Sequence, residues 1–204
     1  MAVELQKGQK VNLNKTGGPS SEILINLNWN QKQTSKKGFF SSLFSLNNAG
    51  AEIDLDLACL YELKNGQKGV VQALGNSFGN LNAAPFIALD ADDRTGASVD
   101  GENLRINGNK IKEIKRILVF TFIYDGVANW KMVDGVVTVK CPGNEDIIVK
   151  MDEYNSNQRT CAIAMLENVG NDTLSVEKII RFFDGHAKMD KAYKWNMRWV
   201  PGKK

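Results

Sequence analysis

The chain has 204 residues, 43% of them apolar, which is enough for one globular domain with its own core. Its formal net charge of +3 is too small to indicate a nucleic-acid-binding protein. No apolar stretch is long enough to span a bilayer, and the charged first residues are not typical of a signal peptide. We therefore expect a single domain over residues 1–204 and no nucleic-acid partner.

Alternation of apolar and polar residues with a period of two predicts most of the secondary structure. The strands predicted in this way cover residues 22–29, 53–61, 115–124, 135–141, 146–151, 160–169, 178–185 and 194–200. Residues 109–116 and 186–194 are predicted to form one or two short helices. About ten short strands separated by glycine-containing turns are typical of an all-β protein, either an antiparallel sandwich or a barrel.

Residues 30–50 are predicted to form a long loop insertion, which is basic at first and then aromatic. The apolar side chains of Phe39, Phe40, Leu43 and Phe44 suit two arrangements. They can tuck beneath the edge of a sheet, or they can form a tip that contacts a partner or a membrane. We favour the tucked or mobile arrangement.

The charges are distributed unevenly along the chain. Residues 51–103 contain nine acidic and three basic side chains, so the remainder of this mildly basic chain is strongly positive. Carboxylates that fold close together repel each other unless a positive charge lies among them. The basic remainder suits anionic lipid headgroups or an acidic protein partner.

The predicted strand at 53–61 contains two of these acids. Its odd-numbered residues, from Ile53 to Tyr61, are apolar or sulfur-containing and are expected to face the core. Asp54 and Asp56 would then lie side by side on the other face, about 7 Å apart along the strand. Because aspartate is a poor strand former, two on one face need a reason, and either solvent or a bound cation would supply it.

A second acidic segment, "DADDRTGASVDGEN", follows at residues 90–103. It offers several carboxylates, the Asn103 amide, two hydroxyls and the backbone carbonyls of a glycine-containing loop. Many oxygen donors without histidine or cysteine suit calcium, which accepts six to eight oxygens in loose geometry. An EF-hand is excluded, because Arg94, Thr95 and Gly101 occupy positions that this loop reserves for other residues. An acidic turn without an ion remains the alternative.

The cysteines and the histidine give little support to an enzyme. Cys59, Cys141 and Cys161 are widely spaced, form no zinc motif, and are interpreted as buried thiols in a reducing cytoplasm. His186 is the only histidine and has no serine motif or cysteine pair nearby, so we expect a structural or exposed residue. The carboxylates could instead serve a metal-dependent hydrolase, which is the second hypothesis.

Four motifs together resemble the tellurium-resistance, or TerD-like, domain family. "DLDLACLY" at 54–61 is similar to the family's DLDASxF strand, and "DDRTG" with "DGEN" to its GDNRTGxGxGDDE loop. "ILVFTFIYDG" at 117–126 is similar to its LVFxVTIxDA strand and turn. The start "LQKGQKVNLNK" also matches, and the GFF loop and the C-terminal residues resemble the TerA branch most.

The resemblance implies a calcium-binding β-sandwich with no catalytic activity. It implies a role in a bacterial tellurite-resistance or stress-response system, in the cytoplasm, in assemblies with other proteins of that system and near the inner face of the membrane. The metal ligands that it implies in this chain are Asp54, Asp56, Asp92, Asp93, Thr95, Asp100, Glu102, Asn103 and Asp125. Since this loop has one carboxylate fewer than the family pattern, we expect one strong calcium site rather than two.

Overall fold

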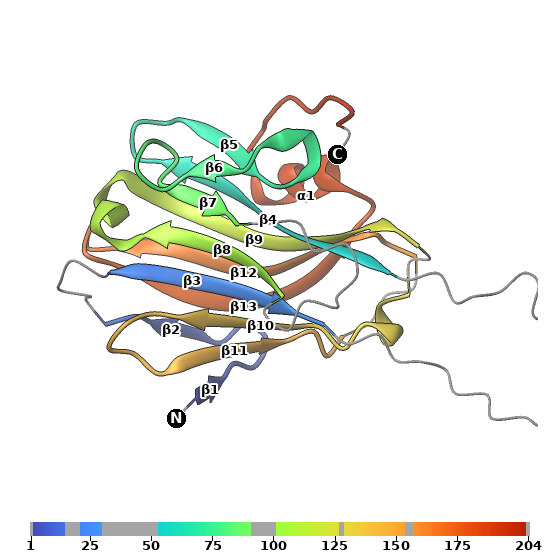
Figure 1. Cartoon of the computed structure of the whole chain (residues 1–204), viewed down its shortest axis with the longest axis horizontal. Helices are drawn as coiled ribbons and strands as arrows, with labels where there is room; N and C mark the ends of the chain where they lie inside the picture. Colours follow the sequence, from blue (N-terminus) through green and yellow to red (C-terminus); the bar gives the residue numbers. More distant parts are fainter. Residues whose placement is uncertain are drawn as a thin grey trace, which may run out of the picture.

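The computed structural model describes residues 2–14, 21–29, 53–90, 101–126, 129–153 and 157–202. These residues form two sheets packed face to face, which confirms the predicted sandwich (Figure 1). The predicted insertion at 30–50, with Phe39, Phe40, Leu43 and Phe44, lies outside the described residues.

The first sheet has seven strands. Their order across the sheet is β1 (Ala2–Glu4), β11 (Asp146–Lys150), β10 (Val136–Lys140), β3 (Glu22–Asn28), β8 (Glu102–Asn107), β7 (Ile87–Leu89) and β6 (Gly79–Asn80). The pairing of β1 with β11 is parallel and the other pairings are antiparallel.

The second sheet has six strands, all antiparallel to their neighbours. Their order is β2 (Lys10–Asn12), β13 (Thr173–Phe183), β12 (Thr160–Val169), β9 (Ile114–Asp125), β4 (Asp54–Leu63) and β5 (Lys68–Val71). Its long central strands account for the near-continuous apolar runs of the sequence, because both of their faces are covered.

Short helical segments connect the strands. They are the 3-10 helices η1 (Leu74–Asn76), η2 (Gly108–Glu113) and η3 (Trp130–Met132), and the α-helix α1 (His186–Tyr193). The two predicted helices are therefore confirmed as η2 and α1. No helix among the described residues is long and apolar enough to cross a membrane.

The strand predicted at 194–200 is wrong, because these residues form no regular structure. Lys194 and Asn196 adopt positive φ angles of 59° and 57°, which are incompatible with a strand. The Asp190 carboxylate also accepts hydrogen bonds from the N–H groups of Asn196 and Met197, at 2.8 and 3.1 Å. The chain therefore turns after α1 and runs over the outside of the six-stranded sheet.

Strand β4 has two buried faces, as its position in the sheet requires. Leu55, Leu57 and Cys59 belong to the core between the sheets, as predicted. Ala58 and Leu60 face outward and belong to a second apolar cluster, which α1 and the C-terminal segment complete with Met189, Trp195 and partly buried neighbours. All three cysteines are free and buried, as expected, and burial raises the pKa of the Cys59 and Cys161 thiols.

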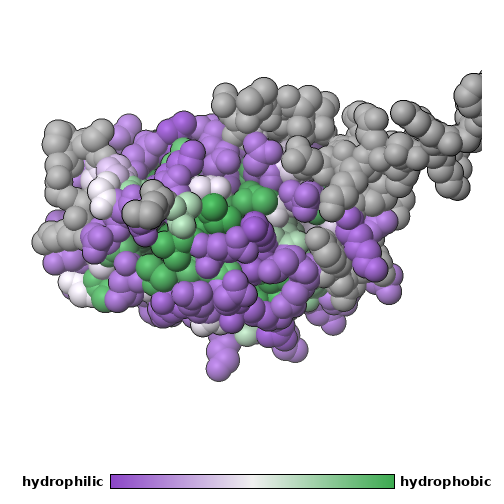
Figure 2. Space-filling view, turned by 90° about the horizontal axis from the view of Figure 1, so that it is seen from below, coloured by the Kyte–Doolittle hydropathy of each residue, from purple (hydrophilic) through white to green (hydrophobic). Residues whose placement is uncertain are grey.

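The edge of the sandwich that carries β1, β2 and β11 has a mixed surface. Figure 2 shows this side, where apolar residues gather in one area and polar residues surround them.

Candidate functional site

Asp54 and Asp56 are buried at the beginning of β4. Asp54 is 7% exposed and Asp56 is fully buried. Asp56 lies opposite Phe122 of β9, on the outer side of the six-stranded sheet, so the alternation predicted for this strand is confirmed. The solvent explanation for the two aspartates is wrong, because neither carboxylate lies on a wet face.

Glu102, the first residue of β8, reaches the same part of β4 from the other sheet. Its side chain points between the sheets, is 1% exposed, and accepts a hydrogen bond of 2.5 Å from the N–H group of Leu57. This contact is available because β5 pairs with β4 only from Cys59 to Glu62. The sandwich thus brings Glu102 next to the residue that follows Asp56.

The predicted metal loop joins β7 to β8, but residues 91–100 lie outside the described residues, and with them Asp92, Asp93, Thr95 and Asp100. Both ends of the loop are described. The N–H group of Asp90 donates to the carbonyl oxygen of Asn103 at 2.9 Å. At Gly101, φ is +60° and a Cβ atom would lie 2.1 Å from the Leu27 carbonyl oxygen, so only glycine fits there. The loop therefore ends within hydrogen-bond reach of β4.

Asp90 itself belongs to an ion-pair cluster. The Arg105 guanidinium donates to the two Asp90 carboxylate oxygens at 2.7 and 2.8 Å and to Glu22 at 2.5 Å. The hydrogen bonds that Arg105 donates to Asp90 and Glu22 raise the pKa of its guanidinium. This cluster anchors the end of β7 to the outer face of the seven-stranded sheet.

The structure places the last two predicted ligands differently. Asn103 follows Glu102 on β8 and so points to the opposite face of that sheet, where its amide oxygen accepts a hydrogen bond of 2.9 Å from Asn26. Asp125 lies opposite Asp54 in the β4–β9 pairing, is exposed, and accepts a hydrogen bond from the N–H group of Gly126. Asp125 thus lies near the buried pair, whereas Asn103 and Glu102 face different surroundings.

The described residues alone do not make a complete metal site. Within the described ranges, no group of three or more histidine, cysteine, aspartate or glutamate side chains is arranged to hold a metal ion. Of the two described ends of the 91–100 loop, the Glu102 end contacts β4 next to Asp56, whereas Asp90 pairs with Arg105 on the seven-stranded sheet.

The other end of β4 carries a different charged cluster, which the sequence analysis did not identify. Glu62 is 5% exposed and its carboxylate accepts hydrogen bonds from Lys115 at 2.7 Å and Arg116 at 2.6 Å. Burial favours the neutral acid, but the hydrogen bonds from these two cations outweigh it, so the pKa of Glu62 is lowered. Only the cross-strand pairing of Glu62 with Arg116 reveals this cluster.

His186 packs between aromatic side chains. Its ring centroid lies 5.0 Å from that of Phe120, 4.6 Å from Phe122 and 5.3 Å from Trp199. Burial lowers the pKa of His186 to about 4, so its ring is neutral at physiological pH. It lines a pocket on the outer side of β5 that no sequence motif indicated.

Comparison with known proteins identifies the family. The model of the TerD domain matches residues 1–167. The chain belongs to the TerD domain family. It is 45% identical over 183 residues to the tellurium resistance protein TerA of Alcaligenes sp., which covers 90% of this chain and 52% of that protein. It is also 32% identical over 134 residues to the stress response protein SCP2 of Bacillus subtilis strain 168, covering 62% and 63% of the two chains.

Two crystal structures of other proteins share the fold. A homologue of the telluride resistance protein TerD from Streptomyces coelicolor A3(2) superposes with a TM-score of 0.53 and 15% identity, over 83% of this chain and 94% of that one. A protein of unknown function superposes with a TM-score of 0.59 and 13% identity, over 87% and 98%. The chain spans about half to two thirds of the length of the curated relatives that it matches.

Proposed function

We propose that this TerD-family chain is a non-catalytic calcium-binding module of a bacterial tellurite-resistance or stress-response system. The names of its curated relatives support the system, since both are resistance or stress-response proteins. One observation supports the calcium site. Asp54 and Asp56 are buried at the start of β4, and Glu102, which follows the acidic 91–100 loop, accepts a hydrogen bond from the N–H group of Leu57, the residue after Asp56.

The charge balance at this end of β4 favours a divalent cation. Removing a carboxylate from water is costly unless an opposite charge or several hydrogen bonds accompany it. The loop adds Asp92, Asp93 and Asp100 to the buried pair, so the local negative charge rises further. In this proposal Asp54, Asp56 and the loop carboxylates hold the ion, Thr95 supplies a further oxygen, and Glu102 holds the end of the loop against Leu57.

Calcium suits this set of donors better than magnesium. All the proposed donors are oxygen atoms, and a glycine-containing loop can adapt to the six to eight ligands and irregular geometry that calcium accepts. Magnesium requires a nearly ideal octahedron and keeps several of its waters. Calcium binding would therefore hold the 91–100 loop in place, because the ion would join the loop to β4.

The direct test is thermal unfolding of chelated protein with and without added calcium. A ligand that binds only the folded state at 100 times its dissociation constant adds about 2.7 kcal/mol of stability, which raises the Tm by several degrees. Asp56→Asn should abolish this increase, whereas the matched variant Asp184→Asn, in an exposed turn, should retain it. No increase at millimolar calcium, or an equal increase in Asp56→Asn, would contradict the proposal.

The non-catalytic part of the proposal has its own test. We expect no turnover of generic esters, phosphomonoesters or glycosides by the calcium-loaded protein. Turnover that disappears in Asp54→Asn would favour the metal-dependent hydrolase instead.

We further propose that the module acts in assemblies with other proteins of the resistance system, at the inner face of the membrane. The positive charge outside residues 51–103 supports contact with anionic headgroups. Sedimentation with anionic vesicles, with neutral vesicles as the control, tests the membrane contact. Binding that is equal for both, or absent from both, would contradict it.

A further inference from the structure

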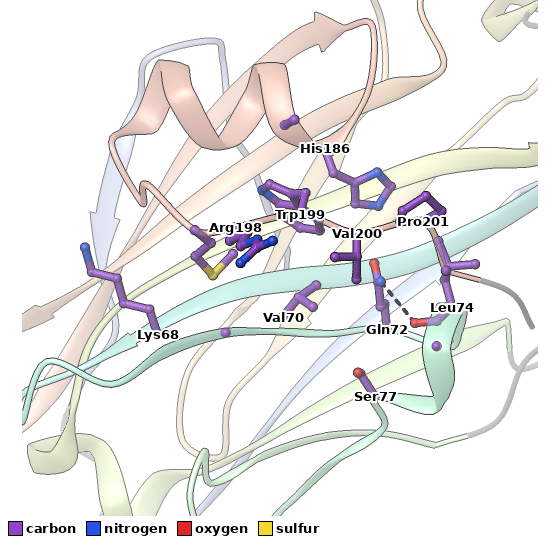
Figure 3. Close-up of a pocket in the computed structure, with 15 residues that line it drawn as sticks. Lys68, Val70, Gln72, Leu74, Ser77, His186, Arg198, Trp199, Val200 and Pro201 are labelled. Atoms are coloured by element: carbon purple, nitrogen blue, oxygen red, sulfur yellow. Dashed lines mark hydrogen bonds between the residues drawn. The ribbon is translucent and has the colours of Figure 1, made fainter.

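A pocket of about 970 Å³ lies on the outer side of the six-stranded sheet. Four parts of the chain form it: β5, the turn around η1, the start of α1 and the C-terminal segment from Met197 to Gly202. Figure 3 shows Gln72, His186 and Trp199 arranged around Val200. The volume lies at the upper end of the range for small-molecule sites, which are mostly apolar with a few polar groups.

Three polar atoms of the side chains that line this pocket are shielded from solvent and lack a hydrogen-bond partner. They are Oε1 of Gln72, Nε2 of His186 and Nε1 of Trp199. Among the described uncharged side chains, only one other buried nitrogen or oxygen atom, Nε1 of Trp29, has no partner. Each unsatisfied group of this kind costs about 1–3 kcal/mol, so their concentration around one pocket indicates that something else satisfies them.

Gln72 is oriented for this role. Its side chain is 6% exposed, and its amide nitrogen donates to the carbonyl oxygen of Leu74 at 3.0 Å. This bond fixes which end of the amide is which, so the oxygen is the atom that needs a donor. Trp199 presents the opposite requirement, because an indole N–H can only donate. A ligand that satisfies both must carry a donor and an acceptor.

The charged residues of the pocket are cationic. Lys68 and Arg198 lie on its rim, and none of the described lining residues is acidic. The ammonium group of Lys68 already donates to the Trp195 carbonyl oxygen at 3.1 Å, whereas Arg198 is exposed and makes no hydrogen bond or ion pair with any described residue. Arg198 is thus available for an anionic group.

The wall opposite β5 is aromatic and loosely held. The rings of Trp199 and His186 pack together with a centroid distance of 5.3 Å. From Arg198 to Gly202 the segment makes no hydrogen bond to the rest of the described chain, and Trp199 holds it by packing against the outer apolar cluster. A small shift of this segment would open the space between β5 and the two rings to a flat molecule.

From these observations we propose that the pocket binds a small planar heteroaromatic molecule that carries an anionic group. The ring packs against Trp199, its polar edge accepts from Nε1 of Trp199 and donates to Oε1 of Gln72, and its anionic group pairs with Arg198. Mononucleotides and heteroaromatic carboxylates both belong to this class. The site is independent of the proposed calcium site, since it uses none of the same residues.

Calorimetric titration of the full chain with two probe sets tests the proposed class of ligand. It also distinguishes mononucleotides from heteroaromatic carboxylates. The first set is adenosine 5′-monophosphate, adenosine and inorganic phosphate; the second is benzimidazole-5-carboxylate, whose ring has one nitrogen donor and one nitrogen acceptor, and its uncharged amide. We expect at least one of the two anionic heteroaromatic probes to bind, and to bind more tightly than its uncharged counterpart. Failure of both to bind at millimolar concentration, or phosphate binding as tightly as the nucleotide, would overturn the proposal.

Substitutions distinguish a ligand role from a structural one. Trp199→Phe keeps an aromatic ring but removes the N–H group, so the Tm of the free protein should hardly change while affinity falls about tenfold. Arg198→Gln should weaken the anionic probe about threefold and leave the uncharged probe unaffected, whereas Lys131→Gln, an exposed charge removed elsewhere, should change neither. Affinity that is unchanged in both Trp199→Phe and Arg198→Gln would also overturn the proposal.

Discussion

Strand β4 buries negative charge near both of its ends, but the two ends have opposite surroundings. At the C-terminal end, Glu62 accepts hydrogen bonds from Lys115 and Arg116, and the Lys68 ammonium lies 3.9 Å away. At the N-terminal end, two of the described neighbours of Asp54 and Asp56 are themselves acidic, Asp125 across the sheet and Glu102 from the facing sheet. One end is neutralised by side chains, and the other gathers more negative charge.

This contrast separates structural carboxylates from candidate ligands better than burial alone. The Glu62 cluster also holds the C-terminal segment, because the Arg116 guanidinium lies 3.7 Å from the centre of the Trp195 ring and donates to the Tyr193 and Lys194 carbonyl oxygens. Its role is therefore to fix the fold. At the other end, Asp54 and Asp56 are buried beside two further carboxylates, and this concentration of acidic side chains supports the proposed calcium site.

Replacing Glu62 should break the neutralised end and produce the largest change in stability. Glu62→Gln leaves Arg116 and Lys115 without their anion, and we expect a loss of about 3 kcal/mol in the free energy of unfolding. Because the pKa of Glu62 is lowered in the folded state, this loss is full above its ordinary pKa of 4.5 and shrinks as the pH falls below it. Urea denaturation at several pH values measures it.

The matched control for that variant is Glu167→Gln on β12, which removes the exposed ion pair between Glu167 and Lys10 of β2. Its cost should stay below about 1 kcal/mol. The effect of Glu62→Gln should also be the same in calcium and in chelator. A calcium-dependent effect would show that the two ends of β4 are coupled, and would contradict a purely structural role for Glu62.

The sequence predicted one end of β4 and missed the other for a physical reason. The acidic end was visible because Asp54 and Asp56 interrupt an apolar alternation within one strand. The Glu62 cluster depends on the register between β4 and β9, which places Arg116 opposite Glu62 across more than 50 residues of chain. Local patterns carry no information about such a register.

The same distinction explains the other differences between sequence and structure. The all-β fold followed from period-two alternation, and the sandwich from the family resemblance. Residues 194–200 alternate like a strand but adopt positive φ angles at Lys194 and Asn196, and the Asp190 carboxylate accepts the N–H groups of Asn196 and Met197. Gln72 and Trp199 meet in one pocket only through the path of the C-terminal segment. Elements set by neighbouring residues were predicted, and sites assembled from distant segments were not.

A second experiment tests His186, which packs on Phe122 on the outer face of the six-stranded sheet. Phe122 lies opposite Asp56 in the β4–β9 pairing. The unfolded chain binds a proton on this histidine near pH 6.5, but the folded chain does so only near its lowered pKa of about 4. The unfolded state therefore holds more protons between these values, and stability falls as the pH decreases through this window.

For this single histidine we expect wild type to lose about 2 kcal/mol more than His186→Phe between about pH 7 and pH 4, after allowance for the residual exposure of the ring. The carboxylates titrate in both proteins, so their contribution cancels in the difference. Guanidinium denaturation curves of the two proteins across this range measure it. Parallel stability profiles would mean that folding does not lower the pKa of His186.

The smallest expected change in stability is that of Glu102→Gln, which tests the role of Glu102 at the acidic end of β4. Glu102→Gln keeps an oxygen acceptor for the N–H group of Leu57 but removes the charge, so the calcium-free protein should change by no more than about 1 kcal/mol. If Glu102 only positions the loop, apparent calcium affinity should fall about tenfold or less, as it does for residues that support metal ligands, while Asp56→Asn abolishes binding. Calcium titration followed by the Tm compares the two variants. Complete loss of calcium binding in Glu102→Gln would show that Glu102 is a direct ligand. Unchanged calcium affinity would show that Glu102 takes no part in the calcium site, because its hydrogen bond to Leu57 would then stabilise only the fold.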